Sequence, residues 1–142
     1  MSGEYYRLFD HTADLGMEIF GGSVEELFSN AGHALFHIMV GENIRQSEAH
    51  HQHQIDVEGA DWPDLMVNWL RELLYLWSGK LQIVDQIDIT SLCETRLYAT
   101  VTSIDFDPAK HRIDKEIKAI TYHQIEVVPD AKGWRASVIF DV

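Results

Sequence analysis

The chain has 142 residues, 46% of them hydrophobic, which suits one compact domain over residues 1–142 with a buried core. Asp and Glu number 23 against 11 Lys and Arg, a formal net charge of -12, which argues against direct nucleic-acid binding because phosphate contacts depend on Lys and Arg. An acidic surface attracts cations or a basic protein face, or simply keeps the domain soluble. The single cysteine, Cys93, excludes an internal disulfide framework.

No continuous apolar run approaches the ~20 residues of a membrane-spanning helix, and residues 1–7 lack the pattern of a signal peptide. We therefore expect a cytoplasmic protein that does not associate with membranes.

The first elements in chain order are two strands and a helix. Residues 5–10 and 15–20 read as strands, and Gly21-Gly22 then breaks the chain. Ser23 and Glu26 fit a capping box at the start of a helix. The apolar stripe of this helix is formed by Leu27, Ala31, Ala34, Leu35 and Ile38, and the helix should end near Val40-Gly41.

The middle of the chain predicts a second helix. Residues 42–53 are polar and ambiguous, and the alternation over residues 54–58 indicates a strand. Asp61 can cap a helix over residues 62–79, and Pro63 suits its first turn. The broad apolar face of this helix consists of Met66, Trp69, Leu70, Leu73, Leu74 and Trp77.

From Leu81 onward the hydrophobic period changes from helical to two. Strands are expected over residues 83–92, 94–104, 116–128 and 134–141, the first two joined around residues 91–93. Two early helices and four late strands predict an α+β domain in which both helices pack on one face of a mostly antiparallel sheet.

One polar segment between the first two strands holds Asp10, His11 and Asp14. Asp and His are common where the backbone turns, so a structural turn is one interpretation. The other is a site in which His11 and a neighbouring carboxylate act as acid and base, although no nucleophile is evident.

The chain ends on an apolar strand whose last residues are Asp141 and Val142. An ordered strand with nothing bound explains this pattern. Alternatively, the Asp141 side chain and the Val142 carboxylate add oxygens beside Asp10 or Asp14. Such a cluster needs a neutralising cation, and oxygen ligands favour Ca²⁺ or Mg²⁺. Lys118 either decorates a strand edge or balances these carboxylates.

The histidines His50, His51 and His53 also invite comparison with a metal site. They lie in a polar stretch without a fixed partner, so we expect a solvated loop there.

Three separated segments resemble the archease family: F-D-H-T-A-D-L-G at residues 9–16, K-A-I-T-Y-H at residues 118–123 and V-I-F-D-V at residues 138–142. Residues 69–76 are similar to the second helix region of that family. The resemblance implies one archease domain over residues 1–142. It also implies a protein cofactor rather than an enzyme, which activates the GTP- and metal-dependent RtcB-type RNA ligase of tRNA splicing and RNA repair.

Archeases promote guanylylation of the ligase and multiple turnover, and they carry a divalent metal, taken as Ca²⁺. The resemblance places its ligands at Asp14, Asp141 and Val142, and it places ligase activation at Lys118, with Asp10 and His11 also facing the partner. An alternative role is a chaperone or binding module for another RNA-modifying enzyme, such as a tRNA methyltransferase. A small metal-dependent hydrolase that uses His11 is a third.

Overall fold

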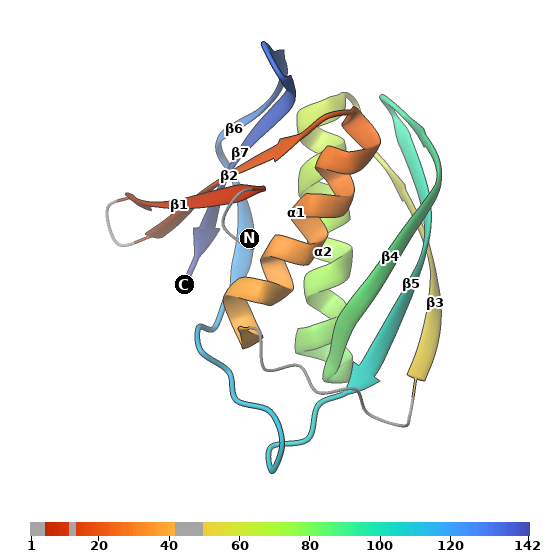
Figure 1. Ribbon diagram of the computed structural model, residues 1–142, viewed down its shortest axis with the longest axis vertical. Coiled ribbons are helices and arrows are strands. Elements are labelled where there is room, and N and C mark those ends of the chain that lie inside the picture. Colours follow the sequence, from red (N-terminus) through yellow and green to blue (C-terminus); the bar gives the residue numbers. More distant parts are fainter. Residues whose placement is uncertain (1–4, 12–13, 42–49) are drawn as a thin grey trace.

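The structure is a computed structural model that describes residues 5–11, 14–41 and 50–142 (Figure 1). Its elements are β1 (Tyr6–His11), β2 (Asp14–Gly21), α1 (Val24–Val40), β3 (His50–Glu58), α2 (Trp62–Lys80), β4 (Gln82–Cys93), β5 (Arg96–Asp105), β6 (Ala119–Asp130) and β7 (Gly133–Asp141). Thr12, Ala13 and the ambiguous stretch at residues 42–49 lie outside the described residues.

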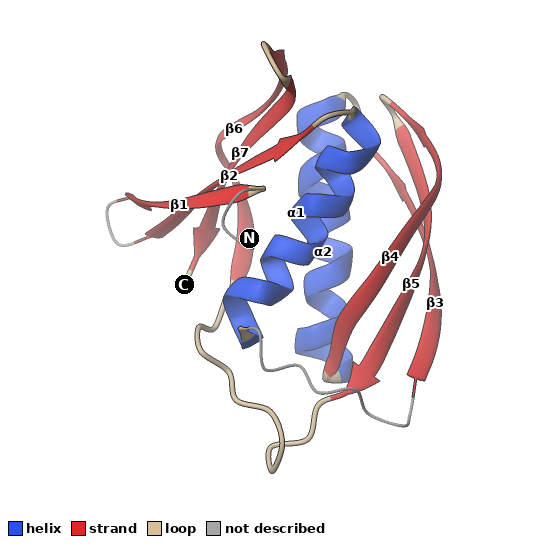
Figure 2. Ribbon diagram, viewed as in Figure 1, coloured by secondary structure: helices blue, strands red, loops and turns tan. Residues whose placement is uncertain are grey.

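The two helices lie between two antiparallel sheets (Figure 2). One sheet has the strand order β1-β2-β7-β6, and the other has the order β3-β5-β4. Helix α1 contacts β2 on one side and β4 on the other, whereas α2 packs most extensively on β6. The α+β class with two helices and antiparallel pairing is confirmed, but the strands divide between two sheets instead of forming one. Both helices are apolar over a wide arc, so each can bury surface against a sheet on either side.

The helix ends follow the capping signals in the sequence. The Ser23 hydroxyl accepts a hydrogen bond from the Glu26 amide at 3.1 Å, and the Glu26 carboxylate accepts one from the Gly22 amide at 2.8 Å. Gly41, with φ 70°, closes α1. The Asp61 carboxylate caps α2 by accepting from the Asp64 amide at 3.0 Å.

The core joins both helices to both sheets. Trp69 on α2 is fully buried, and its indole Nε1 donates to the Phe28 carbonyl of α1 at 2.9 Å. This bond satisfies the one polar atom of a large apolar side chain. In the described part of the chain, no helix is both long and apolar enough to cross a membrane.

One sequence expectation is wrong at the start of β3. This strand begins at His50 rather than at Gln54, so His50, His51 and His53 lie on a strand and not in a solvated loop. Pairing with β5 along the whole length of β3 holds this polar stretch in the sheet, and His53 Nε2 hydrogen-bonds the buried Ser103 hydroxyl at 2.8 Å. Long-range pairing therefore outweighs a weak local strand signal.

Candidate functional site

Strand pairing brings three distant segments to one edge of the four-stranded sheet. His11 on β1 pairs with Asp14 on β2, and Asp141 on β7 pairs with Ala119 on β6. Between them, Leu15 pairs with Phe140, and the antiparallel register one step further sets Asp14 beside Asp141. The predicted carboxylates from the two ends of the chain are therefore neighbours on adjacent strands.

Lys118 lies directly before this row of residues. Strand β6 begins at Ala119, and the Lys118 backbone amide donates to the Asp141 carbonyl at 2.8 Å. The Lys118 side chain is exposed. The structure thus places the predicted activation lysine on the strand end next to Asp141.

The carboxylates lie on the sheet face that points away from the helices. Leu15, Phe140 and Ile120 form the neighbouring row, and all are buried in the core. Because successive strand residues point to opposite faces, Asp14 and Asp141 point outward. Asp10 on β1 pairs with Leu15 on β2 and is exposed.

Two histidines lie close together beside Asp14. The His11 Nδ1 atom is 3.7 Å from Asp14 Oδ2, and the imidazole rings of His11 and His123 have centroids 5.1 Å apart. The His11 Nδ1 atom is buried and has no hydrogen-bond partner among the described residues. The site therefore combines carboxylates from β2 and β7 with imidazoles from β1 and β6.

His123 joins the site although its sequence context predicts no role for it. An irregularity between Thr121 and Glu126 interrupts the β6–β7 register, and Gln124 within it has φ 53°. Thr121 holds the start of this irregularity: its hydroxyl donates to the Ile139 carbonyl at 2.9 Å and accepts from the His123 amide at 3.3 Å. The strand expected over residues 116–128 is therefore confirmed from Ala119 onward, but it begins three residues later than expected and its pairing with β7 is irregular. The only sequence signal for His123 was its place at the end of the K-A-I-T-Y-H segment.

The hairpin that carries His11 and Asp14 depends on close packing at Gly16. Gly16 pairs with Phe9, and a Cβ atom at position 16 would overlap the Phe9 ring. Glycine therefore lets the ring lie directly on the neighbouring strand. This contact fixes the two strands just behind the candidate site.

A contact between α2 and β6 supports the same region from the core side. The Arg71 guanidinium donates to the Ile120 carbonyl at 3.1 Å and lies 4.8 Å from the centre of the Tyr122 ring. The Tyr122 hydroxyl donates to Asp64 Oδ1 at 2.7 Å. This hydrogen bond raises the pKa of Tyr122 and lowers the pKa of Asp64.

The carboxylates of Asp14 and Asp141 supply oxygen donors, the kind of ligand that a hard cation prefers. Asp14 is within ion-pair distance of His11, and neither Asp14 nor Asp141 pairs with a Lys or Arg side chain in the described parts of the chain. Over those same residues, no group of three or more His, Cys, Asp or Glu side chains could hold a metal ion. Val142, the remaining residue of the predicted ligand set, follows Asp141 directly.

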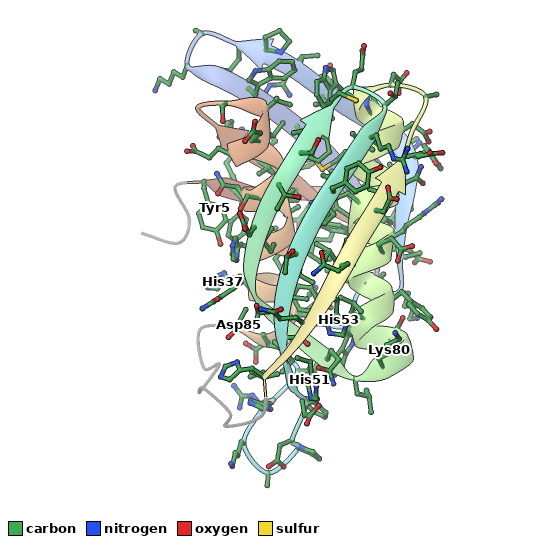
Figure 3. The ribbon with its side chains drawn as sticks, turned by 90° about the vertical axis from the view of Figure 1, so that its right-hand side faces the viewer. Tyr5, His37, His51, His53, Lys80 and Asp85 are labelled. Carbon is green, nitrogen blue, oxygen red and sulfur yellow. The ribbon has the colours of Figure 1, made fainter. Side chains whose placement is uncertain are left out.

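The other histidine group forms a separate network at the far sheet. His51 Nε2 lies 3.1 Å from Asp105 Oδ1, while the Ser103 hydroxyl that contacts His53 donates to Gln82 Oε1 at 2.7 Å. Figure 3 shows His51, His53 and Lys80 toward the same end of the molecule. Burial, Lys80 and His51 all lower the pKa of His53. These contacts tie β3, β5 and β4 together.

Comparisons with known proteins cover nearly the whole chain. Residues 6–142 match the Archease protein family (MTH1598/TM1083). The protein archease of Methanosarcina mazei is 31% identical, covering 99% of this chain and 97% of the relative, and that of Pyrococcus furiosus is 36% identical, covering 94% and 96%.

Solved structures support the same assignment. The solution structure of protein 1598 from Methanobacterium thermoautotrophicum has a TM-score of 0.73 and 28% identity, and the match covers 100% of both chains. A crystal structure from Thermotoga maritima, described as an archease and possible chaperone, shares the fold with a TM-score of 0.61 at 23% identity over 96% of both chains. The family match and these relatives show that the chain belongs to the archease family.

Proposed function

We propose that this protein is a cytoplasmic cofactor that activates an RtcB-type RNA ligase in tRNA splicing and RNA repair. It is not itself the enzyme: it promotes guanylylation of the ligase and multiple turnover. The observation that carries the proposal is the meeting of Asp14 and Asp141 on adjacent strands, with the Lys118 amide bonded to the Asp141 carbonyl directly before β6. Their side chains are not used by the core, so they are free to act on another protein.

The proposed site holds a divalent cation, with Ca²⁺ as the expected ion. Asp14, Asp141 and the Val142 carboxylate would be its ligands, and they match the oxygen donors that such an ion prefers. When bound, the cation would supply positive charge where the carboxylates otherwise repel each other. His11 lies against Asp14 and would orient that carboxylate.

Three residues around the carboxylates would face the ligase. Asp10 on β1 and Lys118, directly before β6, are exposed on opposite sides of the site. His11 lies between Asp10 and the carboxylate pair. A ligase that covers this edge of the sheet would contact the cation site and the activation lysine together.

Ligation of broken tRNA by the cognate ligase, with the ligase limiting, tests the proposal. Wild-type protein should raise the number of turnovers, and Asp14→Asn, Asp141→Asn and Lys118→Ala should each reduce that stimulation. Asp88→Asn, an exposed carboxylate on β4, is the matched control and should behave as wild type. Circular dichroism verifies that each variant remains folded.

Unchanged turnover with wild-type protein would overturn the proposal. Stable binding of a tRNA methyltransferase, together with failure to stimulate the ligase, would instead identify a chaperone or binding module. Phosphoesterase activity of the isolated protein that is lost in His11→Ala would identify an enzyme.

A further inference from the structure

The outer strand β3 is more regular than the other strands at the sheet edges. Its pairing with β5 runs through nine consecutive residue pairs without an irregularity, and it contains no proline, glycine or lysine. By contrast, β4 carries two irregularities, β6 carries one irregularity and Pro129, and β1 has only six residues. Irregular pairing and proline prevent a sheet edge from adding another strand, and a short strand offers less edge. Among the described edge strands, β3 is therefore the best template for a further strand.

The backbone groups of the even-numbered residues of β3 point away from its sheet. The Gly59 amide, directly after the strand, donates to the Thr95 carbonyl at 3.0 Å, so the odd positions face β5. The Asn68 side chain agrees with this alternation, because it donates to the outward carbonyl of Glu58 at 2.8 Å. Within the described parts of the chain, the outward backbone groups without a hydrogen bond are those of His50, Gln52, Gln54 and Asp56.

A hollow of about 450 Å³ lies between this edge and α2. Its lining includes Asp56 and Glu58 from β3 and Asn68, Arg71, Glu72 and Tyr75 from α2. Figure 3 shows β3 as the outer strand of its sheet, with α2 on its free side. The edge is therefore open at the hollow, and a strand added there would lie against α2.

The hollow between β3 and α2 is acidic. Arg71 is the one basic residue in its lining, and its guanidinium already contacts β6. Asp56 and Glu58 share Arg96 of β5, at 3.0 Å and 3.6 Å. Glu72 forms no ion pair with any described residue. Three carboxylates beside two guanidinium groups that are already engaged favour a basic side chain in the hollow.

We infer that β3 receives an extended segment of the RtcB-type ligase as a fourth strand of its sheet. The backbone of the segment pairs with the outward groups of Gln52, Gln54 and Asp56, and one of its lysine or arginine side chains enters the hollow beside Glu58 and Glu72. The identity of the partner rests on the proposed function.

The charge along the edge determines where the basic side chain of the segment lies. Lys80 ends α2 and is close enough to lower the pKa of His53 on β3. A basic residue of the ligase would be repelled by Lys80. It therefore lies at the end of the edge that carries Asp56 and Glu58.

A second copy of the chain fits this edge less well. Pairing of two β3 strands would join two chains that each carry a net charge of -12. In each copy, α2 also lies on the free side of β3, where the body of the other copy would have to fit. A single extended segment with basic side chains avoids both costs. The edge belongs to the sheet that does not contain Asp14 and Asp141, so its substitution should change affinity rather than maximal stimulation.

The test compares Gln54→Pro with Gln54→Ala by the concentration of the protein that gives half-maximal stimulation of the ligase. Proline removes the outward amide and leaves the pairing with β5 intact, so the variant should melt near wild type. Its half-saturating concentration should rise by about tenfold or more, because a backbone hydrogen bond is lost and the ring occupies the edge. Gln54→Ala keeps the amide and should behave as wild type. Both variants lose the side-chain hydrogen bond to Thr100, so only the amide separates them.

Glu72→Lys tests the inference without a change in the backbone. It places a positive charge where the basic side chain of the ligase should bind, so the half-saturating concentration should rise several-fold. Glu94→Lys, at an exposed position in the turn after β4, makes the same change in net charge and should have little effect.

The outcomes separate the two proposals. If wild-type protein stimulates the ligase and Gln54→Pro and Glu72→Lys act at the same half-saturating concentration as their controls, the docking inference is overturned and the proposed function stands. A dimer in sedimentation that Gln54→Pro dissociates would assign the edge to a second copy and also overturn the inference. If wild-type protein leaves the ligase unchanged, the proposed function fails, and the docking inference fails with it.

Discussion

The Lys118 amide donates a 2.8 Å hydrogen bond to the carbonyl of Asp141. One backbone contact thereby joins the lysine proposed to activate the ligase to a proposed ligand of the cation. Any shift of the last strand on cation binding would be transmitted to Lys118 through this bond. The residues proposed for the two functions at this edge of the sheet therefore share one backbone hydrogen bond.

Calcium should raise the melting temperature of the protein in a concentration-dependent manner. A ligand that binds only the folded state raises the free energy of unfolding by about 2.7 kcal/mol when its free concentration is 100 times its Kd. Asp14→Asn and Asp141→Asn should abolish most of the shift, whereas Asp88→Asn should retain it. Differential scanning fluorimetry over a calcium series provides the measurement.

The role of Val142 can be examined separately in the same assay. Two residues added after Val142 move the terminal carboxylate away from Asp141 and should reduce the calcium shift. An undiminished shift in the extended protein would exclude this carboxylate as a ligand.

Phe9 and Gly16 should show strong energetic coupling. Gly16→Ala should lower the free energy of unfolding by about 1–3 kcal/mol, because the new methyl group displaces the Phe9 ring. Phe9→Ala removes the ring, so the double variant should be less destabilised than the sum of the single variants, by more than about 0.5 kcal/mol. Urea denaturation of the four proteins measures this coupling.

Gly22→Ala provides the control for the added methyl group. The nearest atom to a Cβ at position 22 is 3.6 Å away. Gly22→Ala should therefore change the free energy of unfolding by no more than about 0.5 kcal/mol. Additive effects at Phe9 and Gly16 would contradict the direct contact.

Stability should fall on mild acidification because of His33. Burial lowers the pKa of His33 below its ordinary value of 6.5, and Asp85 opposes this only in part. The unfolded chain therefore binds the proton more readily than the folded one. The contribution of neutral His33 to the free energy of unfolding is fully present above pH 6.5. It is lost as the pH falls from 6.5 through the pKa of His33 in the folded protein.

Urea midpoints measured from pH 8 to pH 5 test this effect. His33→Gln should flatten the decline, while His50→Gln, at an exposed position on β3, should leave it as in wild type. An identical decline in His33→Gln would assign the effect to other groups.

The hydrogen bond from Tyr122 should control the pKa of the Asp64 carboxyl group. Tyr122→Phe removes the bond that lowers the pKa of Asp64, so the carboxyl pKa should rise toward its ordinary value of 3.8. Because the folded pKa is depressed, the stabilisation is present above pH 3.8 and is lost as the pH falls through the folded pKa. Carboxyl chemical shifts followed by NMR report the change.

Tyr98→Phe is the matched control. It keeps the ring that packs under Arg96, and Tyr98 lies on β5, in the sheet that does not contain Tyr122. An unchanged Asp64 titration in Tyr122→Phe would mean that the hydrogen bond does not govern this carboxyl group.

Local interactions determined what the sequence alone could show. The caps at Ser23 and Asp61 act within one helical turn, so both helix starts could be read from the sequence. Alternation likewise located β2, β5 and β7, in which apolar residues at every second position, such as Leu15, Met17 and Ile19, are buried. The family and its motifs were also readable, because they depend only on residue identities.

Tertiary structure decided the rest. The division of the strands into two sheets, the strand at His50 and the meeting of Asp14 with Asp141 all depend on pairing between distant segments. His123 lies beside His11 because β6 departs from regular pairing after Thr121. Register and bulges arise from the sum of many contacts over the sheet, so no local pattern specifies them.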